Sequence, residues 1–311
     1  MTSISIVIPV YNEEDCIELL HKEIYEVCER EGYQYEIIIV DDGSSDNTYQ
    51  LAKNLIPIQY IRLQRNFGQT AAMDAGIKKA QYEYIITMDG DRQNDPNDIP
   101  KLIEHLIEND LDVVSGWRKK RKDSFAKRFI SRGANFLRKI IINDGIKDSG
   151  CSLKIYKKHC FEGVNLYGEM HRFIPSILKI KGFSIGEIEV NHRHRGTGVT
   201  KYNWTRTIRG FVDMISIWFW SRYSVRPLHL FGGGGFILLG LGSITGLVSF
   251  TQFILGYSMS DTALPILTAF LLFSGLQLFM FGLLIDMVSK IYYERTTDSS
   301  YLIKEHIDNK K

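Results

Sequence analysis

The chain lacks several patterns by which nucleotide-binding and hydrolytic enzymes are identified. No Gly-x-Gly-x-x-Gly and no Gly-x-x-x-x-Gly-Lys-Ser/Thr follows its first apolar strand-like run, which excludes the phosphate-binding loops of Rossmann and P-loop proteins. No Gly-x-Ser-x-Gly elbow occurs, which argues against an α/β hydrolase. A diphosphate bound by this chain would therefore be held by a metal and by basic side chains.

A surplus of either charge is also missing. The 311 residues include 38 Lys and Arg and 36 Asp and Glu, a net charge of +2. This balance predicts no role in binding nucleic acid or another polyanion. The four cysteines (Cys16, Cys28, Cys151 and Cys160) form no Cys-x-x-Cys pair and match no zinc spacing, so we expect free thiols in a reducing compartment. The first residues show no basic region before an apolar run, so we expect no signal peptide.

Two long segments, 228–257 and 264–288, carry almost no charge. Each exceeds the roughly 20 residues that cross a bilayer core, so both are predicted membrane spans, with a buried hairpin of a soluble protein as the alternative. Glycines in the first segment permit close helix packing and a homo-oligomer. Lys and Arg flank the outer ends but are missing from the linker 258–262, so the positive-inside rule predicts that both termini are cytoplasmic.

Apolar residues at helical spacing precede the first span, over residues 204–225. This pattern favours a helix lying in the membrane interface, and a core helix of the soluble part is the alternative. We expect a catalytic domain over 1–203, this juxtamembrane helix over 204–225, a two-span hairpin over 226–290 and a cytoplasmic tail over 291–311.

β-rich apolar runs alternate with helical segments in the first ninety residues. The predicted strands cover 4–10, 35–40, 58–63 and 84–87, and the predicted helices cover 15–31, a segment from 47 onward, and 69–79. Nearly continuous apolar strands that alternate with helices indicate an α/β fold with a mostly parallel sheet covered by helices. Ligands bind at the carboxyl edge of such a sheet.

Acidic residues follow two of these strands. Asp41-Asp42 comes after the second strand, and Asp89-Gly90-Asp91 after the fourth. Carboxylates so close repel each other unless a cation or a shared proton lies between them. Mg²⁺ or Mn²⁺ fits, because these ions take oxygen ligands and leave positions open for a substrate phosphate. A turn with an N-cap explains Ser44 and Ser45, but not two adjacent acids.

Four motifs occur in order: Ile-Val-Ile-Pro-Val-Tyr-Asn-Glu at 6–13, Val-Asp-Asp-Gly-Ser-Ser-Asp at 40–46, Asn-Phe-Gly at 66–68 and Met-Asp-Gly-Asp-Arg-Gln at 88–93. Together they resemble the inverting family 2 glycosyltransferases with a GT-A fold, over about residues 4–205. With the two spans, the chain is similar to the polyprenyl-phosphate glycosyltransferases, which include dolichol-phosphate mannosyltransferases and bactoprenol glucosyltransferases.

The resemblance implies a role for individual residues on the donor side. Pro9, Tyr11 and Glu13 would line the nucleotide pocket, and Asp41 or Asp42 would accept a hydrogen bond from the base. Asp89, Asp91 and Gln93 would surround Mg²⁺ or Mn²⁺, which neutralises charge on the departing diphosphate. Arg195 and Lys201 lie in a segment that resembles the loop closing over the diphosphate, and Arg193 is a weaker candidate.

On the acceptor side, a phosphate monoester is already anionic near neutral pH, because its second pKa is about 6, so no strong general base is required. The resemblance implies that Arg118, Arg128, Ser131 and Arg132 bind this phosphate, with Lys127 as an alternative. Arginine's planar fork suits phosphate oxygens. The lysines of 118–122 fit better a solvated loop or a patch attracted to anionic lipids. Asp148 is a candidate catalytic residue, because some relatives use an acid in this region as a base, and a turn with a cap is the alternative.

The expected function is inverting, metal-dependent transfer of a hexose to undecaprenyl or another polyprenyl phosphate at the cytoplasmic face of a bacterial-type inner membrane. The segment 92–96 resembles that of bactoprenol glucosyltransferases and favours glucose from UDP-glucose. The alternatives are a dolichol-phosphate-mannose-type synthase using GDP-mannose, and a membrane-anchored family 2 enzyme that extends a saccharide or glycolipid. A non-catalytic scaffold is disfavoured by the intact acids.

Overall fold

The computed structural model divides the chain into two compact units, residues 1–216 and 217–311. It describes residues 2–119, 145–193 and 226–295, together with residues 212, 215, 216, 218–220 and 222–224. Of the juxtamembrane helix predicted over 204–225, the described residues are helical apart from the bend at Ser224.

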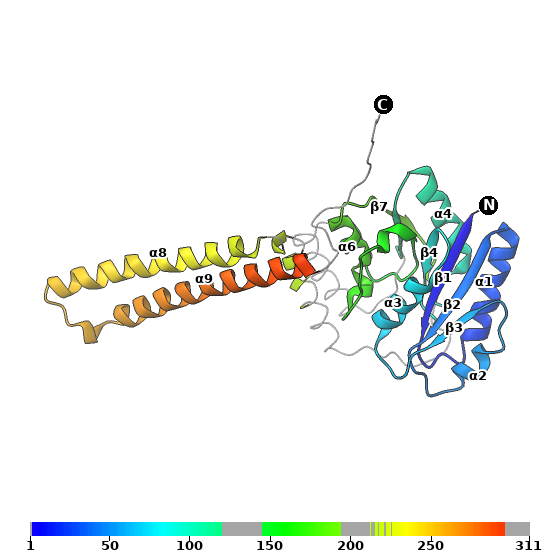
Figure 1. Ribbon diagram of the computed structural model, residues 1–311, viewed down its shortest axis with the longest axis horizontal. Coiled ribbons are helices and arrows are strands. Elements are labelled where there is room, and N and C mark those ends of the chain that lie inside the picture. Colours follow the sequence, from blue (N-terminus) through cyan, green and yellow to red (C-terminus); the bar gives the residue numbers. More distant parts are fainter. Residues whose placement is uncertain are drawn as a thin grey trace, which may run out of the picture. The chain divides into compact units, whose positions relative to one another are not determined.

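A seven-stranded sheet forms the centre of the first unit, in the order β3-β2-β1-β4-β6-β5-β7 (Figure 1). β1 is parallel to β2 and β4, β2 to β3, and β5 to β7, whereas β6 is antiparallel to β4 and β5. The predicted mostly parallel α/β sheet is therefore confirmed. The strands are β1 Ser3–Val10, β2 Gln34–Asp41, β3 Gln59–Arg62, β4 Tyr84–Thr87, β5 Val113–Trp117, β6 Lys154–Lys157 and β7 Ile185–Glu189.

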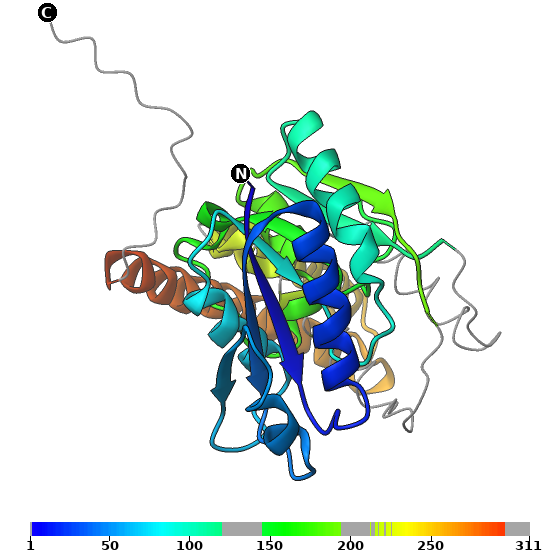
Figure 2. The same ribbon diagram turned by 90° about the vertical axis from the view of Figure 1, so that its right-hand side faces the viewer.

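Helices cover both faces of the sheet, which explains the nearly continuous apolar runs in its central strands. Even-numbered residues of β1, such as Ile4 and Ile6, pack with α1 (Ile17–Glu31) and α4 (Ile99–Glu108). Val7 faces the other way, into a cluster with residues of α3 (Gln69–Lys79) and α6 (Ile174–Ile180). In Figure 2, α1 and α4 lie in front of the sheet. Successive strand residues point to opposite faces, so burial on both faces demands a continuous apolar run.

Short helical elements complete the unit. They are α2 Thr48–Ala52 and the 3₁₀ turns η1 Pro96–Asp98, η2 Lys158–Phe161 and η3 Met170–Arg172. The bounds of α3 agree with the predicted helix 69–79, and those of β4 with the predicted strand 84–87. All four cysteines are buried and free, as expected from their spacing.

Helix α1 shows how the local sequence sets its bounds. Ile17, Leu20, Ile24 and Cys28 are spaced three or four residues apart and are buried on one face. The helix ends at Gly32, whose φ of 65° lies in the left-handed region that glycine adopts readily. The N–H of Tyr33 then donates to the carbonyl of Cys28 at 3.1 Å, which closes the last turn.

The strand directions bring seven chain segments to one edge of the sheet. β1, β2, β3, β4, β5 and β7 run the same way, so their carboxyl ends meet there, and the antiparallel β6 begins there. The segments that follow or precede these strands at this edge are 11–14, 42–48, 63–68, 88–95, 118–119, 148–153 and 190–193.

The second unit contains two long helices, α8 (Pro227–Ile254) and α9 (Leu264–Arg295), joined through the 3₁₀ turn η4 (Met259–Asp261). Both are long and apolar enough to cross a membrane, and only 11% of the most apolar stretch of each helix is buried within the protein. The core hairpin of a soluble protein would bury this surface, so the low burial favours membrane spans.

Close backbone contact holds the two helices together. A Cβ atom on Gly235 would lie 2.8 Å from the carbonyl oxygen of Gly275, and a Cβ on Gly275 would lie 2.9 Å from that of Gly235. Thr268 Oγ1 also donates a hydrogen bond to Thr245 Oγ1 across the pair at 3.0 Å. By contrast, a Cβ on Gly240 would meet nothing within 4 Å. Some of the glycines of α8 thus pack against α9 of the same chain. A homo-oligomer formed through the other glycines stays a prediction.

Replacing Gly235 by alanine is expected to destabilise the hairpin, because the added methyl group forces two backbones apart. The expected loss is about 1–3 kcal/mol, typical of overpacking. Thermal unfolding of the detergent-solubilised protein measures the effect, with Gly240→Ala as the matched control. Equal melting temperatures for the two variants would contradict the packing described here.

Candidate active site at the carboxyl edge of the sheet

The loops that follow β1 and β2 are joined by hydrogen bonds. The backbone N–H of Asn12 donates to Ser44 Oγ at 2.9 Å, and that of Glu13 donates to Thr48 Oγ1 at 2.9 Å. Asn12 has a φ of 53°, a conformation that asparagine tolerates better than most residues. The segment predicted to line the nucleotide pocket is therefore fixed to the loop after the second strand. Pro9 precedes it within β1, opposite Val40.

Asp41 is fully buried and each of its carboxylate oxygens is engaged. Oδ1 accepts the backbone N–H of Ser44 at 2.7 Å. Oδ2 accepts the hydroxyl of Tyr60 at 2.7 Å and lies 3.3 Å from Nε of Arg62. The carboxylate thus ties the loop after β2 to the neighbouring strand β3, and its predicted contact with a nucleobase stays a prediction.

Asp42 organises a different loop. Its two oxygens accept the backbone N–H groups of Phe67 at 2.7 Å and Gly68 at 2.9 Å. Burial raises the pKa of Asp42, and these two N–H groups partly offset the shift by stabilising the carboxylate. The acid pair at 41–42 and the Asn-Phe-Gly motif at 66–68 therefore form one structural unit at the amino end of α3.

Asp89 follows β4 and is oriented by side chains from two other segments. Gln69, the first residue of α3, donates from Nε2 to Asp89 Oδ1 at 2.6 Å. The backbone N–H of Asp89 donates to Ser152 Oγ at 3.2 Å, and Asn94 donates to the same hydroxyl at 2.7 Å. The Asp89 carboxylate is thus oriented by the Gln69 amide, which carries no charge.

The oxygen donors at 89–93 fit Mg²⁺ or Mn²⁺. Asp91 Oδ1 accepts the backbone N–H of Gln93 at 3.1 Å, so these two residues lie together in a tight turn after Asp89. Among the residues that the structure describes, no group of three or more His, Cys, Asp and Glu is placed to hold a metal ion. The predicted set of Asp89, Asp91 and Gln93 would supply two carboxylates and an amide oxygen, hard donors that leave positions for a diphosphate, and it stays a prediction.

Arg118 and Asp148 form a bidentate ion pair. Arg118 Nε donates to Asp148 Oδ2 at 2.7 Å and Nη2 to Oδ1 at 3.0 Å, and only 11% of each side chain is exposed. Burial alone would lower the pKa of Arg118, but the hydrogen bonds and charge of Asp148 outweigh it and raise the pKa. The predicted phosphate-binding arginine and the predicted catalytic acid are thus partners of each other.

Lys154 is buried close to this pair, with 2% of its surface exposed. It begins β6, and its Nζ donates to the carbonyl of Ser149 at 3.3 Å. Burial lowers the pKa of Lys154 to about 8, although nearby Asp148 and Asp89 favour its charged form. The edge therefore holds two cationic groups beside the candidate metal ligands.

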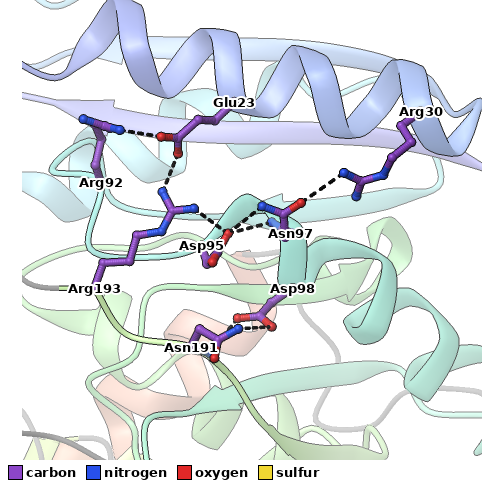
Figure 3. Close-up of polar contacts among 8 residues, drawn as sticks. All are labelled: Glu23, Arg30, Arg92, Asp95, Asn97, Asp98, Asn191 and Arg193. Carbon is purple, nitrogen blue, oxygen red and sulfur yellow. Dashed lines mark hydrogen bonds and ion pairs between the residues drawn. The ribbon is translucent and has the colours of Figure 1, made fainter.

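The segment after β7 is tied to the segment that bears the candidate metal ligands (Figure 3). The N–H of Arg193 donates to the carbonyl of Gln93 at 2.9 Å. The Arg193 guanidinium contacts Glu23 Oε2 at 2.6 Å and Asp95 Oδ1 at 2.7 Å. Arg193, a weaker sequence candidate for the diphosphate, is thus paired with two carboxylates.

Several predicted site residues lie outside the described residues. These are Arg128, Ser131, Arg132 and the alternative Lys127 on the acceptor side, and Arg195 and Lys201 on the donor side. The predicted site residues that the structure does describe, in contrast, lie along one edge of the sheet. They are Pro9, Tyr11, Glu13, Asp41, Asp42, Asp89, Asp91, Gln93, Arg118 and Asp148.

Sequence reasoning missed four residues that the structure places at this edge or in contact with it: Glu23, Gln69, Ser152 and Lys154. The first lies on α1, far from any motif, and the next two are polar residues without a local pattern. Lys154 begins the strand Lys154–Lys157, which has a lysine at each end, so no local pattern marked the first of them as buried.

Asp148→Asn is expected to destabilise the protein by about 3 kcal/mol, because it leaves the buried Arg118 guanidinium without its counter-charge. Thermal unfolding in detergent measures the loss, and Asp110→Asn on the exposed surface is the control. The double variant Asp148→Asn with Arg118→Met should lose less stability than the sum of the losses in the two single variants, because both remove the same ion pair. An unchanged melting temperature for Asp148→Asn would refute the importance of the pair.

Lys154 predicts a pH dependence of stability. The unfolded chain keeps this proton up to its ordinary pKa of 10.5, whereas the folded protein releases it near about 8. Between these values the unfolded state binds more protons, so this group makes the unfolding free energy rise with pH. Melting curves from pH 7 to 10.5 should show Lys154→Met losing that rise, while the exposed control Lys179→Met keeps it. Parallel profiles for all three proteins would contradict the burial of a charged Lys154.

Comparison with known proteins identifies the family. The family described as Glycosyl transferase family 2 matches residues 5–164. Dodecaprenyl-phosphate galacturonate synthase of Rhizobium johnstonii is 39% identical over 318 residues, covering 98% of this chain and 93% of that protein. Undecaprenyl-phosphate 4-deoxy-4-formamido-L-arabinose transferase of Aeromonas hydrophila is 30% identical over 309 residues, covering 97% of this chain and 93% of that protein.

Solved structures support the same fold. Glucosyl-3-phosphoglycerate synthase of Mycobacterium tuberculosis, in complex with Mn²⁺, UDP-glucose and phosphoglyceric acid, superposes with a TM-score of 0.55 over 70% of this chain and 80% of that chain. Its sequence is only 14% identical, so the likeness concerns the GT-A fold alone. Together with the order of the motifs and the full-length relatives, these findings show that the chain belongs to glycosyl transferase family 2.

Proposed function

We propose that this glycosyltransferase transfers a sugar from a UDP-sugar to a polyprenyl phosphate at the cytoplasmic face of a bacterial inner membrane. The observation that carries the proposal is the acidic turn at 89–93, lying at one edge with Arg118 and Lys154, in a chain that ends in two candidate membrane spans. The relatives named for polyprenyl phosphates match nearly the whole chain, including these spans. That extent supports a lipid acceptor over a soluble saccharide.

In the proposed reaction, an oxygen of the acceptor phosphate attacks the anomeric carbon while the bond to the nucleotide diphosphate breaks on the opposite side. Asp89, Asp91 and Gln93 would hold Mg²⁺ or Mn²⁺, whose charge would stabilise the departing diphosphate. Gln69 keeps the Asp89 carboxylate in place through its 2.6 Å hydrogen bond. The configuration at the anomeric carbon inverts in this single displacement.

The acceptor phosphate needs positive charge more than it needs a base. A phosphate monoester loses its second proton with a pKa of about 6, so its oxygen is already nucleophilic at neutral pH. Arg118 and Lys154 supply cationic groups near Asp89. We therefore propose that Asp148 orients Arg118 through their bidentate pair and removes no proton in the reaction.

The sugar is proposed from the relatives. One is named for galacturonate and the other for 4-deoxy-4-formamido-L-arabinose, so neither supports the expectation of glucose. We propose UDP-galacturonate as the first donor to test, because the relative named for galacturonate is 39% identical over 98% of the chain. UDP-glucose and GDP-mannose are the comparison donors.

The orientation in the membrane is also proposed. Arg222, Arg226 and Lys290 flank the outer ends of the two spans, and the linker 258–262 has no Lys or Arg. Cytoplasmic loops are enriched in these residues, which supports both termini and the catalytic unit on the cytoplasmic side.

The test supplies purified protein with a polyprenyl phosphate, Mn²⁺ or Mg²⁺, and one donor at a time from UDP-galacturonate, UDP-4-deoxy-4-formamido-L-arabinose, UDP-glucose and GDP-mannose. Mass spectrometry should detect a monoglycosyl phosphoryl lipid with one UDP-sugar. Asp89→Asn and Asp91→Asn should each lower the rate on the order of a hundredfold or more, since a metal contributes several kcal/mol to the transition state. Asp110→Asn is the exposed control.

Two results would count against the proposal. Full activity in excess chelator would remove the metal from the reaction. Transfer to a saccharide acceptor with no product on the lipid phosphate would replace the proposed acceptor.

A further inference from the structure

Glu23 belongs to none of the sequence motifs, yet its carboxylate joins two arginines at the candidate metal site. It lies on α1, and its Oε1 accepts from Arg92 while its Oε2 accepts from Arg193 at 2.6 Å (Figure 3). Arg193 also reaches Asp95 at 2.7 Å. Glu23 therefore connects α1 to both the segment after β4 and the segment after β7.

Arg92 has a backbone conformation that requires support. Its φ of 58° lies in the left-handed region, which costs a non-glycine residue about 1 kcal/mol or more. It stands between Asp91 and Gln93, so its conformation sets the directions of the two flanking side chains. The ion pair to Glu23 fixes the Arg92 side chain and with it this strained turn.

The segment 191–193 is fastened along the same stretch by backbone bonds. The N–H of Arg193 donates to the carbonyl of Gln93 at 2.9 Å, and the N–H of Asn191 donates to Asp98 Oδ2 at 2.6 Å. His192 forms an isolated β-bridge with Asn94. The Arg193 side chain extends this connection to Glu23, so α1 restrains the turn of the candidate metal ligands at both Arg92 and Gln93.

We propose that Glu23 is a positioning residue for the metal site, which holds Asp91 and Gln93 in place through Arg92 and Arg193. The inference rests on the proposed function, because that function assigns the metal to Asp89, Asp91 and Gln93. Partly exposed ion pairs contribute little to stability by themselves. The principal effect of losing Glu23 is therefore on the geometry of the turn and on metal affinity.

The experiment compares Glu23→Gln with Glu26→Gln in the full-length protein. Glu26 is on the same helix and forms an exposed pair with Lys22 at 3.8 Å, away from the turn. Mn²⁺ binding in the presence of UDP is measured directly by electron paramagnetic resonance, with the melting temperature recorded for each protein. Glu23→Gln should weaken Mn²⁺ binding by roughly tenfold, the size typical of removing a partner that orients metal ligands, and Glu26→Gln should not change it.

A second pair of variants separates the backbone from the ion pair. Arg92→Gly removes the arginine but adopts a positive φ at little cost, whereas Arg92→Ala removes it and keeps the strain. Mn²⁺ affinity should therefore fall further in Arg92→Ala than in Arg92→Gly. A reversed order would overturn the role of the turn.

The failure of this inference is distinguishable from that of the proposed function. If Glu23→Gln binds Mn²⁺ as tightly as the wild type and only its melting temperature falls, Glu23 is merely structural and the inference is wrong. If the wild-type protein with UDP binds no Mn²⁺, the metal assignment fails and the inference fails with it. Transfer to the lipid phosphate is measured separately with the wild-type protein, so that test of the proposed function uses neither variant.

Discussion

Repulsion between carboxylates is the constraint on which the catalytic unit depends. The strand directions bring Asp41, Asp42, Asp89, Asp91 and Asp148 to one edge of the sheet. Three of them are compensated by groups that the structure shows: Asp41 by a hydroxyl, a backbone N–H and an arginine, Asp42 by two backbone N–H groups, and Asp148 by a buried arginine. Asp89 accepts a hydrogen bond from the neutral amide of Gln69 and lies near the cationic groups of Arg118 and Lys154. A metal at the proposed site would compensate Asp89 together with Asp91.

The sequence could predict the features that local patterns control. The apolar runs locate β1, β2 and β4, because strands covered on both faces are nearly continuously apolar. The helical spacing locates α3, and the motif order identifies the family. The pairing of Arg118 with Asp148 was out of reach, because it depends on the insertion of β6 between β4 and β5. Glu23 was equally invisible, since a single acid on the surface of a helix carries no local signal.

Two residues near the candidate metal ligands have an energetically unfavourable environment or conformation. Lys154 is an ammonium group buried with one backbone carbonyl as its hydrogen-bond acceptor, and Arg92 holds a left-handed backbone conformation. Local rules of burial and conformation are violated most often at functional sites, where the chemistry benefits from the charge or the geometry. Lys154 and Arg92 lie at the edge of the sheet where the family's motifs also lie, which agrees with this view.

The antiparallel strand β6 has a consequence for biosynthesis. β4 ends at Thr87, but its second neighbour in the sheet begins only at Lys154. A nascent chain can therefore pair β1 to β4 early, while one side of β4 offers unpaired N–H and C=O groups until more than sixty further residues have left the ribosome. An open edge of this kind invites pairing with other chains. Truncations that end before β6 should consequently aggregate during translation, whereas those that end after β7 retain every strand of the sheet.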